Sequence, residues 1–367
     1  MGYDPYDGLN SHLFQSLPYL SKNRIFRLFW IQFFKKSPVN FRKLTGVRKE
    51  YNPKALALFL SGYCNLYKVE PENKYLSHIK FLIRKLIELR NQQWSGPCWG
   101  YNFDWQARAF FFKKHTPTVV VTSFVINALL DAYDLLKDPE LLKISKDSCA
   151  FVLRDLNRTY DKKGNFAFSY SPLDNSVVYN ASLLASRMLA RVGSYTGEGN
   201  LMKEAKKSVQ YCCDRQRDDG AWAYGNLPYH QWVDSFHTGY DLMCISEYMK
   251  DSGDYVYDEV LKKGLEYYVN NFFTSKGIPK YYDNMIYPID IHAPSQLVIT
   301  MSKMNLFKEQ RELVEKVLSW TLDNMQAKEG YFYFQINKYF SSRIPYMRWA
   351  QAWMFYALSE YKKWTYK

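Results

Sequence analysis

Apolar stretches recur at long intervals along the chain and are typical of helices. Six of them are nearly continuously apolar and rich in small residues, as expected for helices that are buried on most sides. They cover residues 53–68, 117–136, 176–192, 234–249, 290–304 and 345–361. More amphipathic segments, such as 200–216 and 306–327, alternate with them, and Lys and Glu interrupt their apolar stripe. The alternation predicts buried inner helices paired with solvent-facing outer helices.

A glycine among aromatic residues marks a similar point in successive units. The five glycines are Gly100, Gly164, Gly220, Gly277 and Gly330, which are 64, 56, 57 and 53 residues apart. A helical unit that recurs at such a spacing is the signature of a repeat architecture. We therefore predict an all-α fold, an (α/α)6 toroid of six helical hairpins, in which residues 51–367 form a single domain. Residues 1–50 are expected to form an N-terminal extension with a basic amphipathic helix.

Helix starts and loop lengths locate the expected site. Asp234 and Ser176 suit N-cap positions, and Pro53, Pro117 and Pro345 suit first turns. Connections from outer to inner helices are long, roughly 15 to 25 residues, and long loops usually carry function. The site should lie on the long-loop face, where the N-termini of the inner helices converge. Their positive ends favour an anionic ligand.

Basic charge is concentrated near the N-terminus. Of the net charge of +13, nine Lys or Arg lie within residues 22–49, which hold no Asp or Glu. The apolar run at 25–34 is far shorter than the ~20 residues of a membrane span. A helix over residues 22–36 either lies on an anionic membrane surface or packs its aromatic side chains against the toroid. Nucleic acid is not expected, because no recognised motif accompanies the charge.

The cysteines and the start of the chain predict a compartment. The six cysteines form no CxxC pair, and no cleavable signal sequence opens the chain. We expect reduced thiols in a cytoplasmic protein, with peripheral membrane contact through residues 22–36 as the alternative location. Neither a GxGxxG nor a P-loop motif is present, so no cofactor is expected. No metal is expected either, because nothing resembles a zinc motif.

Two pairs of acid and imidazole side chains stand at corresponding helix starts. Asp234 and His237 are spaced to share a helix face, and Asp290 and His292 occupy the equivalent place in the next repeat. A carboxylate can orient an imidazole, which moves protons near neutral pH. These four residues, with Tyr240, are the catalytic candidates. The alternative is that Asp234 only caps its helix and His237 is an interior group.

Aromatic residues and arginines in the long loops are the substrate-binding candidates, because such side chains stack on sugars and clamp anions. They are Trp99, Asp104, Trp105, Arg108, His115, Tyr179, Asn180, Trp222, Arg343, Arg348 and Trp349. The alternative for the tryptophans is that they wedge neighbouring loops together.

Two resemblances accompany these patterns. The stretch from Gln216 to Trp222 fits the Q-x3-G-x-W core of the QW repeat of terpenoid cyclases, and 326–332 is a degenerate copy. Similar turns occur in many α/α toroids, including glycosidases, lyases and sugar epimerases. The segments 51–56, 98–106 and 116–123 resemble a bacterial family associated with polysaccharide biosynthesis, over nearly the whole chain from about Ser37. The resemblance implies a six-hairpin glycosidase-like fold and a role near capsule or exopolysaccharide assembly, without established catalytic residues.

Three functions follow as hypotheses. The first is a carbohydrate-active enzyme that works by acid/base chemistry on an anionic or lipid-linked glycan, as a lyase, epimerase or hydrolase. Hydrolysis is the less favoured of these reactions. It needs two carboxylic acids beside the scissile bond, and no glutamate stands at a helix start comparable to that of Asp234. The second is an isoprenoid-handling protein like a terpenoid cyclase or prenyltransferase, against which the missing DxDD motif counts. The third is a noncatalytic glycan-binding assembly protein.

Overall fold

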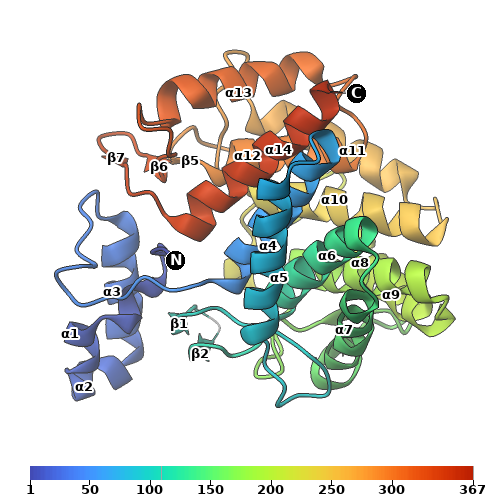
Figure 1. The fold of residues 1–367 in the computed structure, drawn as a ribbon, viewed down its shortest axis with the longest axis horizontal. Coiled ribbons are helices and arrows are strands. Elements are labelled where there is room, and N and C mark those ends of the chain that lie inside the picture. The colour runs from blue at the N-terminus through green and yellow to red at the C-terminus, as the bar shows by residue number, and fades with distance from the viewer. Residues whose placement is uncertain (109, 367) are drawn as a thin grey trace.

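The computed structural model describes residues 1–108 and 110–366. Inner helices surround a common axis, and each contacts the next, with the last returning to the first (Figure 1). They are α4 (Pro53–Val69), α6 (Val119–Leu136), α8 (Tyr179–Thr196), α10 (Ser235–Ser252), α12 (His292–Lys303) and α14 (Trp353–Thr365). A π-helical segment, η4 (Met347–Ala352), leads into α14. The predicted (α/α)6 toroid is confirmed.

The outer layer is formed by the amphipathic helices that alternate with the inner ones. These are α5 (Asn73–Glu88), α7 (Pro139–Ala150), α9 (Gly199–Cys213), α11 (Asp258–Phe272) and α13 (Arg311–Met325). Each of the first five inner helices is followed by one of these outer helices.

Inner helix α6 shows why burial outweighs local preference. Its first turn is a run of valines, a poor helix former, but the Thr118 side chain caps it by accepting a hydrogen bond from the backbone N–H of Val121, at 3.2 Å. Among the described helices, only α6 is long and apolar enough to cross a membrane. In the fold 72% of that apolar window is buried, so α6 is a core helix of the toroid.

The repeated glycine forms the turn that follows an outer helix. Four of the five glycines have a left-handed backbone, with φ values of 81°, 92°, 79° and 90° at Gly164, Gly220, Gly277 and Gly330. At Gly220 a Cβ atom would also clash with the Lys263 carbonyl oxygen. Close approach alone explains Gly100, where a Cβ atom would clash with the Thr116 carbonyl oxygen.

The QW-like motif has a structural role, because it joins a turn to neighbouring outer helices. The Gln216 side-chain amide donates to the carbonyls of Gly220 and Val260, at 3.0 and 2.9 Å, and so joins the turn to α11. The Trp222 indole donates to the Cys212 carbonyl at 3.1 Å. This resemblance to terpenoid cyclases therefore reflects architecture.

Three of the expected helix starts differ from the structure. The sequence predicts Pro117 in a first turn, but it lies before α6, whose N-cap is Thr118, because it forms a β-bridge with Gly100. Asp234 is the N-cap of α10 as predicted, but Ser176 is not the N-cap of α8, which begins at Tyr179. Ser176 instead belongs to the loop, where its hydroxyl and its backbone N–H both donate to the Asp174 carboxylate, at 2.6 and 2.8 Å. Pro345 lies just before η4 and does not open it.

The long loops carry short antiparallel pairs. Strands β1 (Trp105–Gln106) and β2 (Phe111–Phe112) pair, as do β3 (Arg158–Tyr160) and β4 (Phe166–Phe168). Strand β6 (Gln335–Ile336) lies between β5 (Ile289–Asp290) and β7 (Ser341–Ser342). The β5–β6 pair fixes the loop before α12 against the loop before η4, which brings two predicted site segments together.

Charged side chains join the inner helices to one another at their C-terminal halves. Asp131 of α6 pairs with Arg191 of α8 at 2.8 Å, and Arg187 of α8 pairs with Glu247 of α10. Lys303 of α12 lies between Glu247, at 4.0 Å, and Glu360 of α14, at 3.4 Å. Asn65 of α4 accepts from Lys363 of α14 at 3.0 Å, and Ser61 of α4 donates to Asp131 at 2.7 Å. Polar contacts thus run around all six inner helices.

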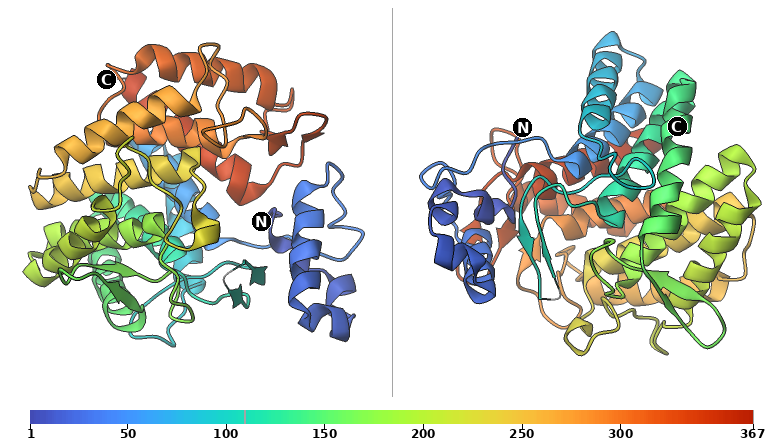
Figure 2. Two further views of the ribbon diagram at one scale, coloured as in Figure 1. Left: turned by 180° about the vertical axis from the view of Figure 1, so that it is seen from behind. Right: turned by 90° about the horizontal axis from the view of Figure 1, so that it is seen from below.

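Residues 1–50 pack on the side of the toroid where the long loops lie. They form η1 (Asp7–Asn10), α1 (His12–Gln15), α2 (Pro18–Lys22) and α3 (Arg24–Lys36), gathered beside the β1–β2 pair in Figures 1 and 2. The predicted basic helix is α3. Glu50 forms a β-bridge with Gly2, so the segment closes on itself before α4 begins at Pro53.

Candidate active site

Asp234 and His237 form a side-chain pair at the start of α10. The Asp234 carboxylate accepts a hydrogen bond from the backbone N–H of His237 at 3.0 Å and contacts the His237 Nδ1 atom at 2.7 Å. The Trp232 indole also donates to this carboxylate, at 3.1 Å. Asp234 is buried, whereas the His237 side chain keeps 21% of its surface exposed. The pair fixes the imidazole and leaves its Nε2 atom as the one that a ligand can reach.

His292 pairs with Tyr240 and not with the side chain of Asp290. The Tyr240 hydroxyl lies 2.8 Å from His292 Nε2, and the Lys54 ammonium donates to the same hydroxyl at 3.5 Å. Burial, and next the charge of Lys54, hold the pKa of His292 well below its usual range, so its ring is neutral. We assign the Tyr240 hydroxyl as donor to Nε2, which leaves the proton of His292 on Nδ1. That buried nitrogen has no hydrogen-bond partner among the described residues.

Lys54 is an unusual buried cation. It is 3% exposed, and its Nζ atom lies 4.3 Å from the centre of the Phe124 ring, 5.3 Å from that of Tyr240 and 5.2 Å from that of Trp353. Burial, assisted by the charge of Arg348, holds its pKa well below the usual range of a lysine. Lys54, Tyr240 and His292 thus form one chain of polar contacts inside the ring.

Asp290 lies in a different environment from Asp234. Its carboxylate accepts from the backbone N–H of His292 at 3.0 Å, from the Trp349 indole at 2.8 Å and from the Gln335 amide at 3.0 Å. Burial nevertheless raises the pKa of Asp290 to about 6. The structure therefore has one dyad of acid and imidazole, at α10, and a separate carboxylic acid just before α12.

Phe236 joins the two histidines into one cluster. Its ring stacks on His292 with a centroid distance of 4.3 Å, and the centroid of the His237 ring lies 4.1 Å away. Trp349 lies edge-on to His292 at 5.1 Å. The candidate catalytic residues Asp234, His237, Tyr240, Asp290 and His292 thus lie together where α10, α12 and η4 begin, as the long-loop argument predicts.

The N-terminal segment covers this cluster. The Arg348 guanidinium donates to both carboxylate oxygens of Asp4, at 2.6 and 2.7 Å. The Tyr6 ring lies 5.6 Å from Trp349, and the Lys35 ammonium donates to the Tyr6 hydroxyl at 2.8 Å. Arg348 and Asp4 are both buried, so this is an interior contact and not a surface ion pair.

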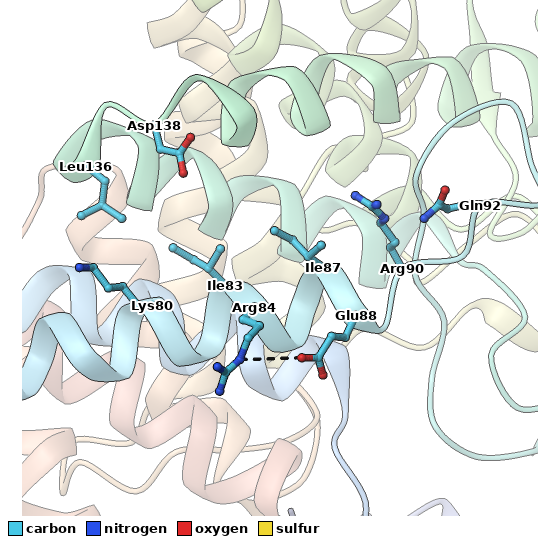
Figure 3. Close-up of a pocket in the computed structure, with 9 residues that line it drawn as sticks. All are labelled: Lys80, Ile83, Arg84, Ile87, Glu88, Arg90, Gln92, Leu136 and Asp138. Carbon is cyan, nitrogen blue, oxygen red and sulfur yellow. Dashed lines mark ion pairs between the residues drawn. The ribbon is translucent and has the colours of Figure 1, made fainter.

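Neither of the two hollows found in the described residues opens at the cluster. A groove of about 810 Å³ lies outside the ring, between α5 and the connection from α6 to α7 (Figure 3). Lys80, Arg84 and Glu88 line it with a few isoleucines, and it contains none of the candidate residues. The second hollow, of about 10 Å³, lies inside the ring near Asp131 and Arg187 and has room for about one water molecule. Of the five catalytic candidates, Asp234, Tyr240, Asp290 and His292 are buried, and the His237 side chain keeps part of its surface exposed.

The remaining predicted residues fall into three groups. Trp99 and Trp222 are buried, and their indoles donate to the carbonyls of Leu86 and Cys212, so both act as wedges between a turn and an outer helix. Trp105 lies nearer the cluster, 6.1 Å from Tyr6, and Asp104 accepts from the Lys114 backbone at 2.7 Å. The third group lies apart from the histidines.

Three of these residues are exposed and two are buried. Arg108, His115 and Arg343 face solvent; the Arg343 guanidinium lies 5.1 Å from the centre of the Tyr333 ring, and the Arg108 carbonyl accepts from Arg24. Tyr179 and Asn180 are buried at the start of α8. None of these five forms a hydrogen bond or ring contact with His237 or His292 in the described structure, and we leave them out of the proposed site.

Sequence reasoning did not select Lys54, Asp4, Tyr6, Lys35 or Phe236. Lys54 did carry a signal, because it is the only charged residue between Asn52 and Cys64, at the head of a helix that is otherwise apolar. The contacts of Asp4 and Tyr6 carried none, since they link the two ends of the chain. No group of three or more His, Cys, Asp or Glu within the described residues is arranged to hold a metal ion.

Comparisons with known proteins identify the architecture. No protein-family model and no curated protein matches the sequence. Among solved structures, the chain is similar to cellobiose 2-epimerase from Bacillus thermoamylovorans B4167, with a TM-score of 0.67, 12% identity, and coverage of 85% of this chain and 88% of that one. It is also similar to a GH76 α-mannanase from Bacteroides thetaiotaomicron, with a TM-score of 0.65, 11% identity, and coverage of 88% and 89%.

A third neighbour is an unsaturated glucuronyl hydrolase specific for heparin, with a TM-score of 0.63, 15% identity, and coverage of 85% and 86%. At these identities the likeness establishes the six-hairpin glycosidase-like fold. The reaction has to be argued from the site itself.

Proposed function

We propose that this chain is a carbohydrate-processing enzyme that moves a proton at a sugar carbon, with His237 as the base. The observation that supports this most strongly is the Asp234–His237 contact of 2.7 Å, beside a second, neutral histidine held by Tyr240. An oriented imidazole with a free Nε2 atom suits abstraction of a carbon-bound proton. That the fold is shared with sugar epimerases and glycosidases supports carbohydrate as the substrate class.

The proposed step divides the work between the two histidines. His237 Nε2 takes the proton from the carbon beside a sugar carbonyl or carboxylate, while Asp234 stabilises the imidazolium through Nδ1–H. His292 donates its free Nδ1–H to the oxygen on which negative charge develops. Delivery of a proton from a second acid on the opposite face gives an epimer, transfer of the abstracted proton from His237 to the neighbouring carbon gives an isomer, and departure of a protonated leaving group gives an unsaturated sugar.

An acidic or lipid-linked glycan of bacterial polysaccharide assembly is the substrate that we propose. Several inner helices begin at the site, and their positive ends favour an anionic group. Arg348 already binds a carboxylate there, that of Asp4, with two parallel hydrogen bonds. A sugar carboxylate or phosphate requires the same geometry.

Entry of a sugar requires movement of the N-terminal segment. Asp234, Tyr240, Asp290 and His292 are each at most 2% exposed, and Tyr6 lies over Trp349. We propose that residues 1–50 act as a lid that swings away from the α10 and α12 starts. Exclusion of water by the closed lid would protect the carbanion-like intermediate.

Hydrolysis is the second candidate, and Asp290 favours it. A carboxylic acid with a pKa of about 6 can protonate a leaving glycosidic oxygen near neutral pH. Asp234 would then have to act as the partner base.

Product analysis separates the two candidates. The purified protein is incubated with a panel of reducing aldoses, disaccharides and uronic-acid oligosaccharides, and the products are identified by NMR. New epimers, ketoses or unsaturated uronates support proton transfer. Shortened saccharides with saturated ends would support hydrolysis instead and refute the assignment of His237 as a carbon base.

A further inference from the structure

The outward face of α3 is apolar and open to solvent. Ile25 is 75% exposed and Phe29 is 62% exposed, and Phe26 and Phe33 on the same side are also exposed. Their spacing places all four on one face of the helix. Soluble surfaces seldom leave a continuous stripe of large apolar side chains in water without an interaction to make.

The opposite face of α3 is already fully occupied. Ile31 and Phe34 are buried, the Trp30 indole donates to the Gly8 carbonyl at 3.0 Å, and Arg27 donates to Gln106 at 2.8 Å. The orientation of the helix on the toroid is therefore fixed by its inward face. Trp30 and Phe34 thus pack inward, as one of the two expectations for this helix has it, whereas Ile25 and Phe29 on the outward face are exposed.

Further exposed apolar side chains lie on the two short helices that precede α3. Tyr19 of α2 is 90% exposed, and Leu13 and Leu17 are exposed in and after α1. Helix α2 contacts both α1 and α3. The three helices gather on one side of the molecule, as Figure 2 shows.

Basic side chains frame this apolar face. Lys22 and Arg24 at one end of α3 and Lys36 at the other are exposed, as are Lys43, Arg48 and Lys49 beyond it. No acidic residue lies within 22–49. A second copy of the chain packed symmetrically here would bring these like charges together, whereas an anionic surface would neutralise them.

We propose that the outward face of α3 (Ile25, Phe26, Phe29 and Phe33) with its basic frame docks on an anionic lipid membrane. Aromatic and aliphatic side chains at the interface between headgroups and acyl chains, surrounded by Lys and Arg, are what a helix lying in the membrane plane presents. The docking itself is independent of the reaction at the site. The inward face of α3 belongs to the proposed lid of residues 1–50. Docking therefore places the long-loop side of the toroid beside the lipid headgroups, where a lipid-linked glycan would arrive. This last consequence rests on the proposed function.

Vesicle flotation of the full chain tests the docking. Vesicles of phosphatidylcholine alone are compared with vesicles that also contain phosphatidylglycerol, at low and high salt. The expected result is co-flotation with the anionic vesicles only, weakened by salt. The double variant I25Q/F29Q should lower the apparent partition coefficient about tenfold or more, because two side chains no longer enter the interface.

A matched control removes equally exposed apolar side chains elsewhere. Leu173 and Val256 are 62% and 67% exposed, and L173Q/V256Q should float as the wild type does. The circular dichroism of each variant checks that the fold is intact. Wild-type protein that fails to float with anionic vesicles overturns the proposal, as does equal loss in both double variants. A dimer in sedimentation that I25Q/F29Q dissolves, without lipid binding, assigns the face to a second copy instead.

Discussion

Asp4 and Arg348 are 344 positions apart in the chain, yet the Arg348 guanidinium donates to both oxygens of the Asp4 carboxylate at 2.6 and 2.7 Å. The contact is buried on both sides. It holds the N-terminal segment against the loop that leads into η4, over the cluster of His237, Tyr240 and His292. Segments near the two ends of the chain therefore meet beside the cluster.

The first prediction concerns this clamp. Asp4→Asn keeps the size of the side chain but leaves the Arg348 charge buried without a counterion, which should lower the free energy of unfolding by about 3 kcal/mol. Hydrogen exchange of the amides in residues 1–50 should become faster. Urea denaturation and exchange mass spectrometry measure the two effects. Lys163→Met, which removes an exposed pair with Asp214, is the control and should change little.

Unchanged exchange in residues 1–50 of Asp4→Asn would mean that the clamp does not hold the segment. Some contact other than that of Asp4 with Arg348 would then have to keep residues 1–50 closed over the site.

The ring of ion pairs between inner helices gives the second prediction. Lys303→Met removes the cation between Glu247 and Glu360, which keep Arg187 and Lys363 as their other partners, so the free energy of unfolding should fall by about 1 to 3 kcal/mol. Lys262→Met removes a surface pair with Glu259 and should leave the stability unchanged. Urea denaturation compares them. Equal stability of both variants would show that the ring contributes nothing.

Asp290 provides a prediction on pH. Its pKa is raised by burial from 3.8 to about 6, so the folded state favours the protonated acid, and the stabilisation is complete below pH 4 and lost as the pH rises through 6. Asp290→Asn cannot ionise. The difference in free energy of unfolding, wild type minus variant, should therefore fall by about 2 to 3 kcal/mol between pH 4 and pH 7. A difference that stays constant or rises over this range contradicts the assignment.

Replacement of Lys54 should raise the stability of the protein and lower its activity. Lys54→Met keeps the length of the side chain and removes a buried amine, so the free energy of unfolding should rise by about 1 to 3 kcal/mol. Turnover should fall about tenfold or more, because the Tyr240 hydroxyl loses its donor. Thermal denaturation and turnover are measured together, with Lys114→Met at the half-exposed pair with Glu50 as the control. A less stable variant with full turnover would show that Lys54 does not support the reaction through Tyr240.

The sequence predicted those features that depend on local pattern. The spacing of the turn glycines and the two kinds of helix established the toroid, and the lengths of the loops indicated the face on which His237 and His292 lie. Contacts across the ring were not accessible to such reasoning. Asp290 and His292 are near neighbours in sequence, but their side chains bond to Trp349 and Tyr240, which belong to other inner-helix units.

Local pattern also could not tell which tryptophans join a turn to an outer helix and which lie in the histidine cluster. Trp222 and Trp349 both stand in aromatic-rich segments, but the Trp222 indole donates to a backbone carbonyl and that of Trp349 to the Asp290 carboxylate. The cover formed by Asp4 and Tyr6 depends on how residues 1–50 fold back. The periodicity of the sequence carries no information about how this segment folds back.

The central claim is that His237, oriented by Asp234, removes a carbon-bound proton from a sugar. The most direct measurement is incorporation of deuterium from D₂O into the panel of sugars, followed by loss of ring-proton signals in ¹H NMR. Wild-type protein should exchange one proton of its substrate. His237→Gln and Asp234→Asn should each slow the exchange about a hundredfold or more, although the amide side chain of the latter variant can still cap α10. Exchange that continues at the wild-type rate in His237→Gln, or sugar turnover without any deuterium on carbon, would contradict the account.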